Sequence, residues 1–203
     1  TALHWAAEHR QEKVVDLLLK AGADPNAVTR YGIRPLAISC LAGDWNSVVR
    51  FLKSGSQVDA RGPSQETALM IASRLGHLQI VRSLVDAGAD VDATDRSGQS
   101  ALMWAAAAGH TQVVKMLVVA GAAQHREQPS GFNAFFFAVR GGHIECVEAL
   151  IELGCDVNQV MNVQRPGGRS PARNTPAVAL AVENGRFELA LRLVELGADP
   201  NDQ

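Results

Sequence analysis

Six histidines and three cysteines are the side chains of this 203-residue chain best suited to metal binding or nucleophilic catalysis. The cysteines are Cys40, Cys146 and Cys155, an odd number without a C-x-x-C pair. A disulfide framework is therefore not expected, and a four-ligand zinc site cannot be assembled from them. His143 and Glu145 match the H-x-E half of a zinc deaminase signature, but no P-C-x-x-C follows to supply the other ligands.

Other catalytic motifs are also missing from the sequence. It contains no G-x-x-x-x-G-K-[ST] phosphate loop, no H-E-x-x-H zinc motif and no G-x-S-x-G nucleophile motif. We therefore predict that the chain is not an enzyme, with no catalytic, cofactor-binding or metal-binding residues and no small-molecule substrate. A hydrolase or metal enzyme hidden in the loops is the weaker alternative, because no nucleophile, base and orienting residue are clustered.

Composition narrows the remaining classes of function. The net charge is −2, and 20% of the residues are charged while 47% are hydrophobic. Phosphate binding needs an excess of Lys and Arg, so this balance argues against nucleic acid as a partner. The apolar runs are too short for a transmembrane helix, so no membrane insertion is expected. The compartment, cytoplasmic or exported, stays open.

The elements that must position these side chains are repeated along the chain. Two columns of glycine recur every 33 residues, and a step of 43 before the last repeat marks one ten-residue insertion. The first column contains Gly22, Gly55, Gly88, Gly121, Gly154 and Gly197, and the second contains Gly43, Gly76, Gly109, Gly142 and Gly185. A fixed period of this length is typical of solenoids and repeat arrays.

Each repeat has the same internal pattern. A helix-capping residue, such as Thr67 or Ser100, precedes a short Ala-rich helix. That helix carries a column of large apolar residues beside a column of small ones, which predicts closely stacked helices. The large column is Trp5, Ile38, Ile71, Trp104, Phe137 and Leu180, and the small column is Ala6, Ser39, Ala72, Ala105, Ala138 and Ala181. A second amphipathic helix follows and ends at a glycine.

The segments TALHWAA, GHLQIVRSLVDAGADVDATDRSGQSALMWAAAAGH and GADPN resemble ankyrin repeats, and the array is similar to long bacterial ankyrin repeat proteins. The resemblance covers the chain except for the insertion. It implies an all-α repeat solenoid, a curved stack of about six helix-turn-helix units with β-hairpin-like finger loops. It also implies that the concave face and the finger tips bind other proteins.

We expect a single solenoid over residues 1–203. The predicted repeats cover about 1–28, 29–61, 62–94, 95–127, 128–160 and 171–203, with a loop insertion at about 161–170. Both terminal repeats carry apolar outer helices, whereas the end repeats of a complete solenoid are usually more polar. The chain is therefore interpreted as a slice of a longer protein, and we expect it to be monomeric.

The repeat gives most of the reactive side chains a structural explanation. His143 shares its column with His77 and His110, and the resemblance assigns His4 to hydrogen bonding between fingers. Cys40 and Cys146 fall at positions held elsewhere by Ala or Val, so burial is expected, and Cys155 is the most plausible reactive thiol. The run Phe135-Phe136-Phe137 is interpreted as core packing.

The repeat pattern does not determine the residue type at the finger tips or just before the first glycine turn. The predicted partner-binding residues at these positions are Arg30, Tyr31, Arg61, Arg74, Leu75, Arg96, Phe132 and Arg140. Arg and aromatic side chains dominate binding energy at interfaces, so we predict a non-catalytic module for a protein partner, acidic or extended. The alternatives are a structural spacer, a regulatory or targeting segment of a larger protein, and a nucleic-acid binder that uses the arginines.

Overall fold

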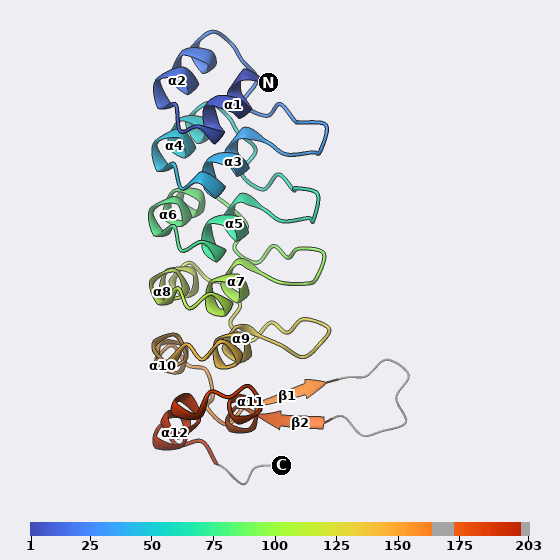
Figure 1. The fold of residues 1–203 in the computed structure, drawn as a ribbon, viewed down its shortest axis with the longest axis vertical. Helices are drawn as coiled ribbons and strands as arrows, with labels where there is room; N and C mark the ends of the chain where they lie inside the picture. Colours follow the sequence, from blue (N-terminus) through green and yellow to red (C-terminus); the bar gives the residue numbers. More distant parts are fainter. Residues whose placement is uncertain (164–172, 200–203) are drawn as a thin grey trace.

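The computed structural model describes residues 1–163 and 173–199, which contain twelve helices and one two-stranded sheet. The helices form six antiparallel pairs stacked along one axis (Figure 1). The first helix of each pair, here called the inner helix, is α1 (Ala2–Glu8), α3 (Pro35–Ala42), α5 (Ala68–Arg74), α7 (Ala101–Ala107), α9 (Ala134–Gly141) or α11 (Ala177–Glu183). The second, the outer helix, is α2 (Glu12–Lys20), α4 (Trp45–Lys53), α6 (Leu78–Asp86), α8 (Thr111–Val119), α10 (Ile144–Glu152) or α12 (Phe187–Glu195).

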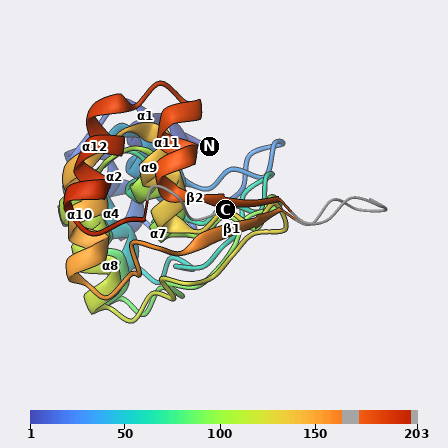
Figure 2. The same cartoon turned by 90° about the horizontal axis from the view of Figure 1, so that it is seen from below.

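The helices form two layers. Each inner helix contacts the inner helix of the next repeat, and the outer helices from α2 to α10 stack in the same way. Seen along the stack, the inner helices lie between the outer helices and a row of loops that project to one side (Figure 2). Each loop joins an outer helix to the next inner helix and is called a finger below. This arrangement confirms the predicted all-α repeat solenoid.

Local sequence signals fix the ends of the inner helices. The side chains of Thr67, Ser100 and Asn133 cap α5, α7 and α9 by accepting a hydrogen bond from the backbone N–H three residues later, at 3.4, 3.4 and 3.1 Å. Gly43 and Gly142 follow α3 and α9 with φ of 67° and 80°. This left-handed conformation favours glycine and ends each helix.

The column of small residues lies at the centre of the stack. All six of its members, from Ala6 to Ala181, are fully buried, so the inner helices approach one another closely, as predicted. The large column behaves differently. Ile71, Phe137 and Leu180 are buried, but the side chain of Trp5 is 55% exposed and Trp104 is half-buried. Exposure therefore varies along this column from one repeat to the next.

Backbone amides and side-chain oxygens connect consecutive fingers at their bases. The side chains of Asn26, Asp59, Asp92 and Asn158 accept hydrogen bonds of 2.8–3.0 Å from backbone N–H groups in the next repeat. His125 occupies this position in the remaining repeat. There the connection is made by Gln124, which donates to the carbonyl of Leu153 and accepts from the Cys155 thiol.

Histidines add further bonds between repeats. His4 Nε2 donates to the carbonyl of Ile33 at 3.0 Å, while its Nδ1 accepts from the hydroxyl of Thr1. His110 and His143 bond in the same way to the carbonyls of Arg74 and Ala107, at 3.1 and 3.0 Å. The structural explanation of these histidines is therefore confirmed.

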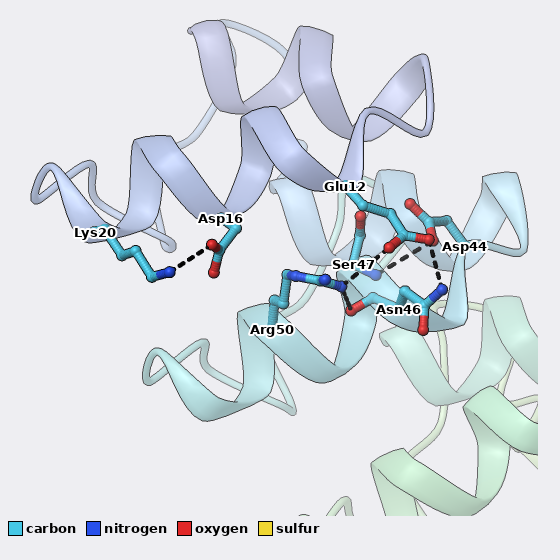
Figure 3. A network of polar contacts seen from close by, with 7 residues as sticks. All are labelled: Glu12, Asp16, Lys20, Asp44, Asn46, Ser47 and Arg50. Atoms are coloured by element: carbon cyan, nitrogen blue, oxygen red, sulfur yellow. Dashed lines mark hydrogen bonds and ion pairs between the residues drawn. The ribbon is translucent and has the colours of Figure 1, made fainter.

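The outer layer carries its own polar contacts. Figure 3 shows Glu12 of α2 placed over α4, where its carboxylate accepts from the amide of Asn46 and pairs with Arg50 at 3.4 Å. Lys20 pairs with Asp16 within α2 at 2.7 Å. Exposed pairs of this kind contribute little to the free energy of unfolding. We do not assign a binding site to them.

The base of the last finger is a short antiparallel sheet. Strand β1 (Val160–Val163) pairs with β2 (Arg173–Pro176), with Val160 opposite Pro176 and Met161 opposite Thr175. The start of the predicted insertion, about 161–170, therefore belongs to β1. Its remainder lies outside the described residues.

Candidate protein-binding face

The surface between the inner helices and the fingers carries most of the predicted binding residues, and we call it the inner face. Several apolar side chains are exposed on it. Trp5 is 55% exposed and Leu41 is 49% exposed on inner helices, Leu75 is partly exposed at the end of α5, and Tyr31 is 62% exposed on the α2–α3 finger. A row of exposed apolar groups beside charged ones is the composition of protein-binding surfaces.

Arg74 is held at the centre of the inner face. Its guanidinium carbon lies 5.1 Å from the centre of the Trp104 ring, and its Nη1 lies 3.9 Å from Glu66 Oε2. Trp104 in turn donates from Nε1 to Asp95 Oδ2 at 3.1 Å. These contacts join two fingers and two inner helices, so Arg74 is oriented before any partner arrives.

Arg140 forms a second unit of the same kind. Its guanidinium carbon lies 4.8 Å from the centre of the Phe132 ring and 4.9 Å from that of Phe137. No carboxylate among the described residues pairs with Arg140, and its side chain is exposed. The arrangement presents a fixed positive charge above an aromatic base, which suits an acidic group on a partner.

The three predicted finger arginines make two kinds of contact. Arg30 lies at the tip of the α2–α3 finger with its guanidinium carbon 4.7 Å from the centre of the Tyr31 ring. Arg61 instead donates from Nη1 to the carbonyls of Thr94 and Gln65, at 2.6 and 3.1 Å. Arg96 donates to the carbonyl of Pro63 at 3.4 Å. The last two therefore also hold neighbouring fingers together.

A pocket opens on the inner face between the α2–α3 and α4–α5 fingers. It encloses about 130 Å³, and we call it the finger pocket. Its apolar lining includes Ile33, Leu36, Leu41, Val58 and Ile71, and its charged lining is Arg34, Arg61 and Glu66. Of these, only Arg61 is among the predicted binding residues.

Arg34 occupies an unusual place in the repeat. It is the N-cap residue of α3 and makes no side-chain cap hydrogen bond, whereas the same position holds Thr67, Ser100 and Asn133 in the next three repeats. Its Nη1 donates to the carbonyl of Arg61 at 3.4 Å, and its buried Nε has no acceptor within the described residues.

The cysteines are not placed for chemistry. All three are buried free thiols, and burial raises the pKa of Cys155 to about 11. The thiolate is the reactive form, so the interpretation of Cys155 as a reactive thiol is not supported. Burial also raises the pKa values of Cys40 and Cys146. In residues 1–163 and 173–199, no group of three or more His, Cys, Asp or Glu side chains is placed to hold a metal ion.

The surroundings of His77 alter its titration. Its imidazole lies against Gly43, where an added Cβ would be 2.8 Å from the ring. Burial lowers its pKa below 6.5, and the positive charges of Arg10 and His110 lower it further. This environment favours the neutral ring, which fits a packing role.

The sequence analysis missed three contributors to the inner face. Trp5 and Trp104 were placed in the column of large apolar residues and were not among the predicted binding residues. Trp5 stacks on His9 with ring centres 4.3 Å apart. Arg34 was not singled out. A charged residue in a column of capping residues was the signal that could have identified it.

The stacked helix pairs, the fingers and the exposed inner face define a helical repeat protein of the solenoid class. Residues 36–127 and 102–203 match the family description "Ankyrin repeats (3 copies)", and residues 1–30 match "Ankyrin repeat". The chain therefore belongs to the ankyrin repeat family, whose repeats are generally protein–protein interaction modules.

Curated relatives match only parts of the chain. A probable E3 ubiquitin-protein ligase from Oryza sativa subsp. japonica is 31% identical over 85 residues, which are 41% of this chain and 19% of that protein. A palmitoyltransferase from Kluyveromyces lactis is 39% identical over 77 residues, 36% of this chain and 10% of that protein. The human neurogenic locus notch homolog protein 4 is 38% identical over 86 residues, 41% of this chain and 4% of that protein. The chain thus spans less than a fifth of the length of each.

Proposed function

We propose that this chain is a non-catalytic protein-binding module whose inner face and finger tips receive a protein partner with acidic groups. The observation that carries the proposal is the pair of pre-oriented arginines, Arg74 against Trp104 and Arg140 against Phe132 and Phe137. Arginine fixed over an aromatic ring loses little conformational freedom on binding, so its contact with a carboxylate costs less entropy.

The charge of this surface supports the same proposal. The chain as a whole has a net charge of −2, yet Arg30, Arg74 and Arg140 all lie on the inner face. Local positive charge on a weakly acidic protein favours an acidic partner surface. No helix in the described ranges is long and apolar enough to cross a membrane. We further propose that the chain acts as a monomer and that its predicted repeat boundaries are the units of the array.

Affinity capture from source-cell lysate, read by mass spectrometry, tests this function. The bait carrying Arg74→Glu and Arg140→Glu should lose a protein that wild type captures. The matched control reverses two exposed charges on outer helices, Lys13→Glu and Arg82→Glu, and should keep the capture. Circular dichroism and thermal unfolding establish that all baits are folded.

Equal capture by the inner-face and outer-face variants would refute the proposed binding surface. Absence of any specific capture by the folded wild type would favour the spacer alternative. Retention that falls steeply with salt on duplex DNA, with no protein captured, would favour the nucleic-acid alternative.

A further inference from the structure

The finger pocket has the shape and lining of a site for one apolar side chain. Leu36, Ala68 and Ile71 are almost fully buried and form its inner wall, while Leu41 and Val58 line it closer to solvent. Its volume of about 130 Å³ is close to the ~150 Å³ of an apolar protein cavity that holds benzene. A leucine, isoleucine or methionine side chain is of that size.

The fingers on either side of the finger pocket are joined differently from the next two fingers. The α4–α5 and α6–α7 fingers are held by the 2.6 Å bond from Arg61 to the carbonyl of Thr94 and by the 3.1 Å bond from the Arg96 amide to the carbonyl of Ser64. The α2–α3 and α4–α5 fingers meet through the longer Arg34–Arg61 bond of 3.4 Å.

Arg34 supplies the charge for recognition. Glu66, the acidic residue of the pocket lining, pairs with Arg74, and Arg61 is engaged with the carbonyls of Gln65 and Thr94. The buried Nε of Arg34 is left without an acceptor in the part of the chain that the structure describes. No carboxylate among the described residues pairs with Arg34, and a guanidinium forms short charge-assisted hydrogen bonds with a carboxylate.

The helix cap gives an independent reason to assign Arg34 to function. Its backbone, with φ of −105° and ψ of 155°, has the conformation of the capping residue Thr67, with φ of −98° and ψ of 166°. Pro35 follows at the first helical position, as suits a capped helix. Arginine cannot accept the cap hydrogen bond, so local stability is given up at this position, which is typical of functional sites.

We propose that the finger pocket binds an extended segment of the partner protein in which a leucine-sized apolar residue stands next to Asp or Glu. The apolar side chain enters the pocket and the carboxylate accepts from Arg34. This inference rests on the proposed function and adds to it the chemistry of the segment that is recognised.

Selection of displayed short random peptides on the immobilised wild-type chain tests the proposal. The selected peptides should share an Asp or Glu beside Leu, Ile or Met, and their affinities are then measured by fluorescence anisotropy. Arg34→Thr should weaken binding on the order of ten- to a hundredfold, from the loss of a hydrogen bond between charged groups. Ala37→Leu, which fills the pocket from α3, should abolish binding. Arg126→Thr, the same change at an exposed position on another finger, should leave the affinity unchanged.

Three results would overturn the pocket proposal. The first is that the selected peptides lack the acidic–apolar pair. The second is that they bind the Arg34→Thr and Ala37→Leu variants with the same affinity as wild type. The third is that no peptide is selected at all, because a preformed pocket needs no folded partner. The protein-binding function is judged separately. Lysate capture that survives Arg34→Thr and Ala37→Leu but is lost with the Arg74 and Arg140 reversals refutes the pocket alone.

Discussion

Replacing Arg34 with threonine should make the protein more stable. The threonine hydroxyl would accept from the backbone N–H of Ala37, as Thr67 does from Met70 at 3.4 Å. Filling an empty N-cap position contributes about 0.5–2 kcal/mol, typically about 1. The bond that is lost, from Arg34 to the carbonyl of Arg61, is 3.4 Å long and exposed, so it offsets little of the gain.

Urea and thermal unfolding measure this effect, with an expected rise in melting temperature of about 2–4 °C per kcal/mol for a chain of this size. Because each repeat contacts only its neighbours, hydrogen exchange of the α3 amides should slow more than that of α9 amides. Arg34→Ala is the matched control, since it removes the guanidinium without adding a cap. If Arg34→Thr is no more stable than Arg34→Ala, the cap argument is refuted.

Three further predictions concern packing and titration. Gly109→Ala should lower the free energy of unfolding more than Gly22→Ala. Both positions have positive φ, which costs an alanine about 1–2 kcal/mol, but the new Cβ at Gly109 would lie 2.5 Å from His143 Nδ1, while that at Gly22 meets open space. Equal losses in urea unfolding would contradict this account. The pKa of His77 is lowered in the folded state, so the unfolded state binds more protons, and the free energy of unfolding should fall as the pH drops below about 6.5. His77→Gln should make the free energy of unfolding less dependent on pH in this range. An unchanged pH dependence would assign the effect to other groups. Cys155 should resist alkylation at neutral pH in the native protein and react after unfolding, because its buried thiol has a pKa of about 11; rapid labelling of the native thiol would show that the site opens.

The repeat pattern was sufficient to predict the fold. Glycines every 33 residues and capping residues such as Thr67 identify helix ends by local chemistry, and these signals need no knowledge of distant contacts. The column of small residues likewise predicted close helix packing, since only small side chains fit there.

The inner face was harder to predict because its exposure depends on the neighbouring fingers. Trp5 and Phe137 share one column, yet Trp5 is exposed and Phe137 is buried beneath Phe132 and Arg140. Periodicity assigns a residue to a face of a helix but does not say what covers that face. The pocket beside Arg34 is likewise lined by residues of two fingers, whose relative placement the sequence does not display.

The bonds at the finger bases also determine how the array can change length. Asp59 accepts from the amide of Asp90, and Asp92 accepts from that of Ala123, 33 residues further along. Deleting one whole repeat would place the amide of Ala123 opposite Asp59, so the same bond would form across the new junction. A duplicated repeat would find its bonds in the same way. His125 interrupts the series, so the junction beside it, where Gln124 makes the contacts, is the one that recombination would preserve least easily.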